Sequence, residues 1–151
     1  MLDKLIGRKE VKIDNQGRII IPLKWKEVFQ NSKEVFGITN FGAYLIGNSL
    51  LDGLEKVLKA ESKEKAEKEA LNLRVIWIYS SLDLSKLENP LSYSEMEQMH
   101  VDDKRRITIK PNLFDYAKLE KEGEAIILGD PNKILVMNPE TYDSYIELLN
   151  I

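Results

Sequence analysis

The amino-acid sequence predicts an α+β protein, mostly β-strand with capping helices, in which two similar halves of one chain pack together. Three observations predict this class: a short motif occurs twice, alternating apolar residues surround each copy, and helically spaced apolar residues follow a proline after each copy. With 151 residues, 43% of them hydrophobic, the chain is long enough for one compact domain or two small interlocked halves.

The repeated motif is Asp-x-x-x-Arg, and its two copies lie 88 residues apart. Asp14 aligns with Asp102, and Arg18 aligns with Arg106. Apolar residues alternate with polar ones on both sides of each motif, which is the period of a half-buried strand. Each copy is therefore predicted to form a strand, a tight turn and a second strand.

A glycine marks the first turn and is absent from the second. Gly17 fits a turn position with positive φ, because glycine adopts that conformation without a steric penalty. Arg105 stands at the same place in the second copy. The second turn is therefore expected either to differ in type or to carry strain.

The pairing of Asp with Arg across a tight turn has two interpretations. In the structural one, the aspartate caps the turn through backbone N–H groups and pairs with the arginine. In the functional one, the rigid turn presents the guanidinium to phosphate or to the edge of guanine. Both hold if the aspartate orients an arginine that also reaches DNA. We assign the fixing of the turns to Asp14, Gly17 and Asp102.

The same order of elements is predicted after each copy. A short helix follows each proline, a hairpin follows each helix, and a closing helix follows each hairpin. In the first copy these elements are residues 23–29, residues 35–39 with 44–46, and a helix from Leu50. In the second copy they are residues 112–119, residues 125–128 with 134–137, and a helix from Pro139.

The residues between the copies are predicted in less detail. Glu and Lys side chains four residues apart in residues 61–69 are typical of a solvated helix. Residues 71–79 are bulky and apolar, and form either the buried end of that helix or a strand, while residues 80–93 favour an irregular loop. We divide the chain into a first half (1–58), a helical linker and loop (59–96) and a second half (97–151).

Composition excludes several kinds of site. There is no cysteine and only one histidine, which excludes disulfides, thiolate metal sites and histidine clusters. His100 would share a strand face with Asp102, but no third catalytic partner is visible. We therefore expect no catalytic residue, no metal, no cofactor and no small-molecule substrate, and predict that the protein is not an enzyme.

The charge is unevenly distributed along the chain. The net charge is −3, but residues 1–33 contain eight Lys or Arg against four Asp or Glu. This basic end could contact phosphate locally while the acidic remainder keeps the protein soluble. No apolar stretch approaches the roughly 20 residues of a membrane span, and no signal peptide is present, so we expect a soluble cytoplasmic protein with no membrane partner.

The first copy with its surroundings resembles the AbrB/SpoVT/MazE swapped-hairpin family. Residues 11–22 read VKIDNQGRIIIP, and the usual family pattern is Asp-x-x-Gly-Arg, three apolar residues and Pro. Two copies in one chain resemble the MraZ family, whose second copies tend to end the strand with a proline one place late, as residues 107–111 do. The resemblance covers roughly residues 8–58 and 97–148.

The resemblance implies a double-split β-barrel formed by two pseudo-symmetric repeats and assembled into dimers or larger rings. It also implies sequence-specific binding of double-stranded DNA and transcriptional repression, which places the protein at the nucleoid. Matched by position, DNA contact falls on Arg18 and Arg106, then on Lys12 and Lys26. Six basic neighbours are added on charge alone: Arg8, Lys9, Lys24, Lys104, Arg105 and Lys110.

The two copies are not equivalent, and two other functions are weighed beside the regulator. The first copy keeps its glycine and lies in the basic segment, so Arg18 is expected to make the stronger contact. One alternative is an antitoxin-like module that binds DNA and a protein partner, and another is an oligomeric scaffold that binds no DNA. Antitoxins of this family usually carry a disordered tail, whereas residues 142–149 have a packed pattern, which favours the regulator.

Overall fold

The computed structural model describes residues 8–22, 34–39, 68, 72–80, 96–130 and 133–149, and these form an α+β arrangement, as the sequence predicts. The strands are β1 (Arg8–Lys12), β2 (Arg18–Ile20), β3 (Glu34–Thr39), β4 (Ile76–Ser80), β5 (Glu97–His100), β6 (Arg106–Thr108), β7 (Glu124–Asp130) and β8 (Lys133–Met137). The helices are α5 (Pro111–Tyr116) and α6 (Pro139–Leu149).

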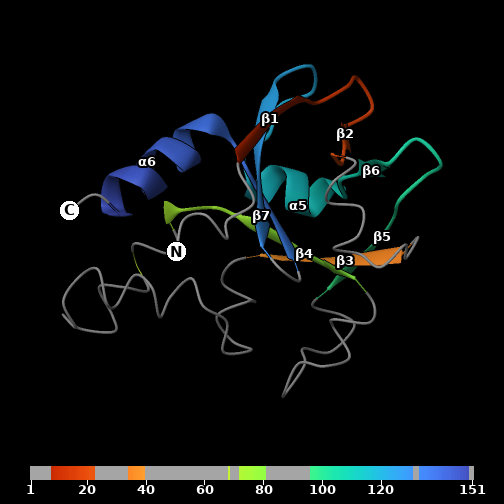
Figure 1. Cartoon of the computed structure of the whole chain (residues 1–151), viewed down its shortest axis with the longest axis horizontal. Coiled ribbons are helices and arrows are strands. Elements are labelled where there is room, and N and C mark those ends of the chain that lie inside the picture. Colours follow the sequence, from red (N-terminus) through yellow and green to blue (C-terminus); the bar gives the residue numbers. More distant parts are fainter. Residues whose placement is uncertain are drawn as a thin grey trace.

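The described strands form one six-stranded sheet and one two-stranded ribbon (Figure 1). The sheet has the order β1-β7-β8-β4-β3-β5 with antiparallel neighbours throughout, and β2 pairs with β6 in what we call the β2–β6 ribbon. The first strand of each repeat pairs with the other repeat: β1 with β7, and β5 with β3. The two halves of the chain are therefore interleaved.

Equivalent backbone hydrogen bonds fix the β2–β6 ribbon at both ends. The Ile21 N–H donates to the Arg105 carbonyl at 2.8 Å, and the Ile109 N–H donates to the Gly17 carbonyl at 3.0 Å. The two donors, Ile21 and Ile109, are 88 residues apart in the sequence, and so are the two acceptors, Gly17 and Arg105. Each strand of the ribbon is thereby bound to the turn of the opposite repeat.

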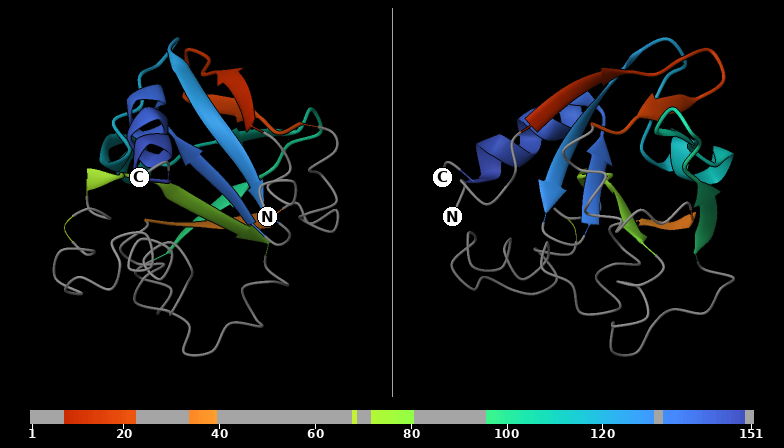
Figure 2. Two further views of the ribbon diagram at one scale, coloured as in Figure 1. Left: turned by 60° about the vertical axis from the view of Figure 1, so that its left-hand side comes forward. Right: turned by 45° about the vertical axis from the view of Figure 1, so that its right-hand side comes forward.

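Two hydrophobic clusters lie on the two faces of the sheet. Along β4, Ile76 and Ile78 belong to the cluster beneath the β2–β6 ribbon and α5, whereas Trp77 and Tyr79 belong to the cluster beneath α6. This alternation follows from the two-residue period of a strand. Figure 2 shows α5 and α6 on different sides of the β7–β8 hairpin, which matches the two clusters.

The end of α5 explains why this helix is shorter than predicted. Lys118 has a φ of 53°, which stops the helical path, whereas the sequence predicts a helix to residue 119. The Leu119 N–H donates to the Phe114 carbonyl and the Lys118 N–H to the Asp115 carbonyl, each at 3.1 Å. This is the Schellman pattern, in which the reversed residue is Lys118 rather than glycine.

The start of α6 is tied to the end of α5. The Asn138 Oδ1 accepts the Thr141 N–H at 2.7 Å, and Pro139 follows as the first helical residue. The Asn138 Nδ2 also donates to the Ala117 carbonyl at 3.1 Å. One side chain thus caps α6 and positions it against the preceding helix.

The hairpin and closing helix predicted for the second repeat are confirmed by β7, β8 and α6. In the first repeat the predicted pairing of residues 35–39 with 44–46 is wrong, because the neighbours of β3 are β4 and β5. Of the alternatives for residues 71–79, the strand is observed from Ile76 onward as β4, inside the 59–96 segment, while Asn72 is still helical. The helices predicted at 23–29, from Leu50 and over 61–69, and the 80–93 loop, lie wholly or almost wholly outside the described residues.

The two turns of the repeated motif share one backbone conformation. Gly17 has a φ of 75° and Arg105 a φ of 63° at the same place in the second turn. Of the two possibilities left by the sequence, the second turn keeps the type and carries the strain. A left-handed conformation costs a residue other than glycine about 1–2 kcal/mol.

We expect Gly17→Ala to lower the free energy of unfolding by about 1–2 kcal/mol, measured by urea denaturation. The loss comes from the positive φ and not from a clash, because a Cβ at this position would lie 3.6 Å from the nearest Phe114 atom, an ordinary contact. Gly17→Asn is the control, since asparagine tolerates the left-handed region and should lose less. Equal losses in the two variants would contradict this account.

A candidate nucleic-acid interface

The carboxylate of Asp14 organises the first turn. Its Oδ1 accepts the backbone N–H groups of Gln16 and Arg18, each at 2.9 Å. Its Oδ2 accepts the Nε–H of the Arg18 side chain at 2.6 Å. One side chain therefore fixes both the path of the turn and the direction in which the arginine leaves it.

The second turn repeats these contacts 88 residues later. The Asp102 Oδ1 accepts the N–H groups of Lys104 and Arg106 at 2.9 Å, and its Oδ2 accepts the Arg106 Nε–H at 2.7 Å. These are the contacts that the structural interpretation of the motif describes. They leave open a second use of the arginines, because each bond occupies only Nε.

The hydrogen bonds lower the pKa of both aspartates. At Asp14 partial desolvation raises the pKa, but the hydrogen bonds from Arg18 and Gln16 outweigh it and hold the pKa below its ordinary value. At Asp102 the backbone N–H of Arg106 lowers the pKa most, and the remaining hydrogen bonds outweigh the opposing effect of desolvation. Each turn therefore holds a carboxylate against a guanidinium.

The two motif arginines lie diagonally across the outer face of the β2–β6 ribbon. Arg18 pairs in register with Thr108, and Arg106 pairs with Ile20. The arginine side chains are 23% and 27% exposed, and within the described residues neither guanidinium makes a further hydrogen bond through its terminal nitrogens. Each guanidinium thus has four terminal N–H groups that bind no described residue, and the two arginines lie on the same face of one ribbon.

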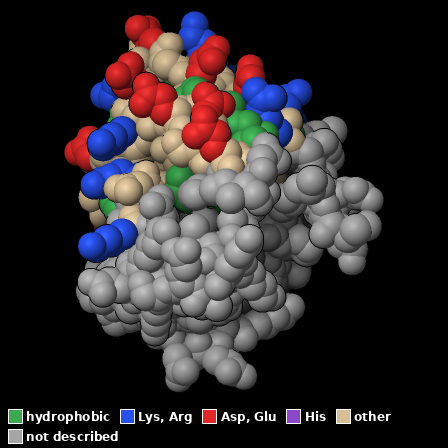
Figure 3. All heavy atoms as spheres, turned by 90° about the vertical axis from the view of Figure 1, so that its left-hand side faces the viewer, with side chains coloured by type: hydrophobic (Ala, Val, Ile, Leu, Met, Phe, Trp, Pro, Cys, Tyr) green, Lys and Arg blue, Asp and Glu red, His purple; other side chains and the backbone are tan. Residues whose placement is uncertain are grey.

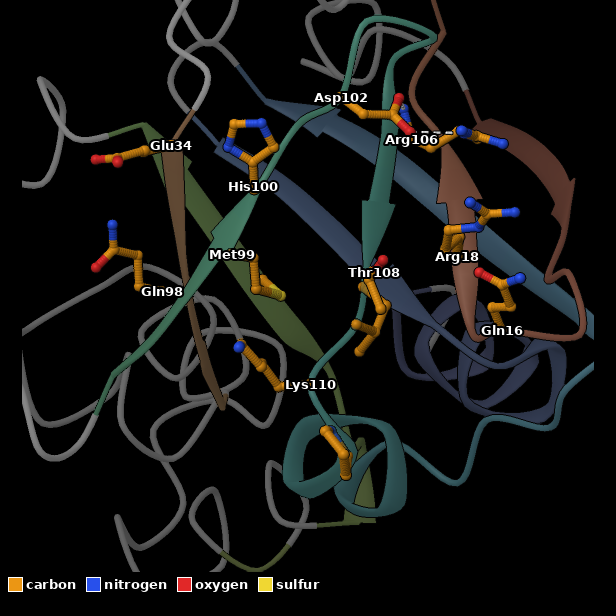
Figure 4. A pocket seen from close by; sticks show the side chains of 12 residues that line it. Gln16, Arg18, Glu34, Gln98, Met99, His100, Asp102, Arg106, Thr108 and Lys110 are labelled. Carbon is orange, nitrogen blue, oxygen red and sulfur yellow. Dashed lines mark hydrogen bonds and ion pairs between the residues drawn. The ribbon is translucent and has the colours of Figure 1, made fainter.

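A hollow opens beside this ribbon, between it, β5 and the start of α5. Figure 4 shows Arg18 and Gln16 on one side of the hollow, and His100, Gln98 and Glu34 on the other. Lys110 contributes a further cation below Thr108. Among the described side chains that line it, three are cationic (Arg18, Arg106 and Lys110) and two are carboxylates (Glu34 and Asp102).

The other predicted contact residues are scattered. On β1, Lys9 and Lys12 are exposed, while Arg8 pairs with Glu10 and lies over the Tyr142 ring at 5.0 Å. Lys104 is exposed in the second turn, and the Arg105 Nε–H donates to the Ile21 carbonyl at 3.1 Å, which binds one repeat to the other. Lys24 and Lys26 lie outside the described residues.

Three residues not predicted as contacts, Ile20, Thr108 and Gln16, lie near the motif arginines in the structure. Ile20 and Thr108 face outward on the ribbon, and Gln16 lines the hollow. The two-residue period that predicts the strands also places Ile20 and Thr108 on the face of the arginines. That signal was present in the sequence, whereas the pairing of β2 with β6 was not.

Acidic side chains lie on another part of the surface. The exposed face of α6 carries Glu140, Asp143 and Glu147 and no Lys or Arg. Figure 3 looks at this side of the molecule and shows Asp and Glu side chains interspersed with Lys and Arg side chains. The acidic side chains of α6 therefore lie on the opposite face of the sheet from the β2–β6 ribbon. Among the described residues there is no group of His, Asp and Glu that could hold a metal ion.

No family model matches the chain. It aligns with the transcriptional regulator MraZ of Chlorobaculum parvum at 26% identity, over 89% of this chain and 79% of that protein. It aligns with the transcriptional regulator MraZ of Pelodictyon phaeoclathratiforme at 26% identity, over 89% of this chain and 84% of that protein. It aligns with the transcriptional regulator MraZ of Symbiobacterium thermophilum at 26% identity, over 94% of this chain and 89% of that protein. The chain is similar to MraZ. This confirms the resemblance predicted from the repeated motif.

No helix in the described part of this MraZ-like chain is long and apolar enough to cross a membrane.

The lowered aspartate pKa values predict how the stability of this protein depends on pH. A carboxyl group whose folded pKa lies below its unfolded value, about 3.9, stabilises the fold above that value and loses this effect as the pH falls through the folded pKa. Asp102→Asn should therefore lower the free energy of unfolding near neutral pH, and its difference from the unsubstituted chain should shrink below about pH 4. Urea unfolding at both pH values measures this.

Asp103→Asn is the control for charge removal in the same turn. Asp103 is exposed and accepts none of the hydrogen bonds that organise this turn. We expect its substitution to have little effect at either pH. If the difference in free energy of unfolding between Asp102→Asn and the unsubstituted chain stayed constant down to acid pH, the lowered pKa of Asp102 would not explain the stability.

Proposed function

We propose that this protein is a sequence-specific DNA-binding transcriptional regulator of the MraZ type, acting as a repressor. The observation that carries the proposal is the pair of arginines that two equivalent aspartates orient on one exposed ribbon. The similarity to proteins named as transcriptional regulators supports the same function. That similarity also supports a protein that is not an enzyme, and we expect it to need no cofactor.

In this proposal the β2–β6 ribbon faces the DNA. The terminal N–H groups of Arg18 and Arg106 suit phosphate oxygens or the acceptor edge of guanine, which take two parallel hydrogen bonds from a guanidinium. Lys110 at the rim of the hollow suits a phosphate. The remaining proposed contacts are Arg8, Lys9, Lys12, Lys24, Lys26, Lys104 and Arg105.

The proposal extends to architecture and assembly. We infer that the six-stranded sheet and the ribbon belong to a double-split barrel, since the turns of the motif lead from each outer strand of the sheet into the ribbon. The division into residues 1–58, 59–96 and 97–151 stays a prediction. The partners are double-stranded DNA and further copies of this chain, in the cytoplasm at the nucleoid.

The packing of α6 favours the regulator over an antitoxin. Tyr142 and Tyr145 pack against the cluster that contains Trp77 and Met137. A segment that packs on its own core in this way is poorly suited to wrap around a partner protein. This supports a regulator whose C-terminal helix belongs to the fold.

DNA binding is tested by gel-shift titration over genomic fragments at several salt concentrations. We expect Arg18→Ala and Arg106→Ala each to weaken binding by about 1–3 kcal/mol and to reduce the salt dependence, with the larger loss for Arg18→Ala. Arg18→Lys keeps the charge but lacks the two-pronged geometry, so it should retain the salt dependence and lose affinity.

A matched control removes a positive charge elsewhere on the surface. Lys118 is exposed and borders a hollow with Glu120, Glu124 and Glu140, so Lys118→Gln should leave DNA binding unchanged. Circular dichroism establishes that each variant is folded. Absent binding by the unsubstituted chain, or unchanged affinity and salt dependence in both arginine variants, would overturn the proposal.

Self-association is tested by light scattering. We expect a mass that is a multiple of the 17.4 kDa chain, because a few phosphate contacts per ribbon give weak binding that several copies multiply. Affinity for a long DNA fragment should then fall when the protein is diluted until it dissociates. A monomer that binds DNA with full affinity would contradict this part of the proposal.

A further inference from the structure

The outer face of the β2–β6 ribbon carries an apolar side chain beside its arginines. Ile19 and Ile107 pair across the ribbon and are fully buried, so the residues that flank them in each strand face outward. Ile20 is one of these and is 50% exposed, more than any other large hydrophobic side chain in the described part of the chain.

The register distinguishes Ile20 from an ordinary exposed apolar residue. Single apolar side chains are common on protein surfaces and carry no argument by themselves. Here Ile20 stands directly across from Arg106, and Thr108 stands directly across from Arg18. Ile20 and Thr108 are also 88 residues apart, so they occupy the same place in the two repeats. Each arginine is therefore paired with a β-branched side chain that presents methyl groups.

We propose that Ile20, and more weakly Thr108, contacts the C5-methyl group of thymine in the major groove, next to the base or phosphate held by the opposite arginine. This inference rests on the proposed DNA-binding function and assigns part of its sequence specificity to an apolar contact. Ile20 is the stronger reader of the two because its side chain offers more apolar surface than that of threonine.

The dimensions of the ribbon fit this assignment. The major groove of B-DNA is about 12 Å wide and admits a two-stranded ribbon, and it is the groove in which the thymine methyl group is exposed. Directly opposite residues in an antiparallel pair have Cβ atoms about 4.5–5.5 Å apart, between one and two base-pair steps of 3.4 Å. With the rungs of the ribbon directed along the groove, an arginine and the methyl-bearing side chain across from it would reach neighbouring base pairs.

The arginines beside Ile20 favour DNA over a second copy of this chain as its partner. A protein surface that covered Ile20 would also cover Arg106 across from it and Arg18 in the same strand. The guanidinium nitrogens not bound to aspartate would then need buried acceptors, and an unpaired buried charge is strongly unfavourable. A duplex offers guanine and phosphate acceptors at the spacing of its base pairs, together with the thymine methyl groups.

The test removes the methyl group from the DNA and from the protein separately. Duplexes selected by the unsubstituted chain from a random-sequence library are remade with deoxyuridine in place of thymidine, which deletes only the C5-methyl groups. We expect the unsubstituted chain to lose about fourfold in affinity for each methyl group contacted, the value for one buried methyl or methylene group. Ile20→Ser should bind the thymidine duplex more weakly and lose most of the sensitivity to deoxyuridine.

Two further variants keep the test independent of folding. Ile20→Val retains methyl groups and strand propensity, so it should keep the sensitivity to deoxyuridine, while Thr108→Ser should reduce that sensitivity slightly. Equal losses on deoxyuridine DNA for the unsubstituted chain and Ile20→Ser, or no loss for either, would overturn the inference while leaving DNA binding intact. Light scattering tests the other occupant. If Ile20→Ser changes the mass of the protein but not its sensitivity to deoxyuridine, Ile20 lies at a contact between copies of the chain, and the inference is overturned as well.

Discussion

Three hydrogen bonds to one carboxylate set the geometry of each repeat. Asp14 and Asp102 each bind two backbone N–H groups of their turn and the Nε–H of the arginine that follows. The turn directs the chain out of the six-stranded sheet and into the β2–β6 ribbon, so the placement of the second strand depends on this carboxylate. The same contact orients the arginine. A single residue type at one position therefore serves both the fold and the surface that we assign to DNA.

The interleaving of the repeats makes the structure a cooperative unit. β1 hydrogen-bonds to β7 and β5 hydrogen-bonds to β3, so each repeat completes the sheet of the other. The ribbon joins one strand from each repeat, and its buried side chains Ile19 and Ile107 pack in the shared core. Most of these pairings join residues far apart in the sequence. Bringing such distant strands together costs chain entropy before their contacts stabilise the fold. This is typical of a fold that forms as a whole and comparatively slowly.

The sequence predicted the local structure well and the long-range pairing poorly. Period-2 alternation, the Asp-x-x-x-Arg turns and the proline before α5 are local signals, and the strands, turns and second-repeat elements followed from them. The predicted partner of residues 35–39 was wrong. The prediction assumed a hairpin with the next strand, which is the commonest connection, whereas β4 begins 37 residues after the end of β3. At the candidate site, both arginines were predictable from the motif. The two-residue period also places Ile20 and Thr108 on the face of the arginines, but their positions across from Arg106 and Arg18 were not predictable, because no local pattern encodes which strand lies opposite.

The β2–β6 ribbon has an almost symmetric backbone and unsymmetric side chains. Its central rung is the Ile19–Ile107 pair, and a half-turn about that rung exchanges Arg18 with Arg106 but replaces Ile20 by Thr108. In a dimer of identical chains the two ends of such a ribbon would be alike, and a molecule lying along it could be reversed without changing any contact. Because both strands here belong to one polypeptide, each end has its own sequence. The ribbon therefore has a polarity, and a linear ligand bound along it would have a preferred orientation.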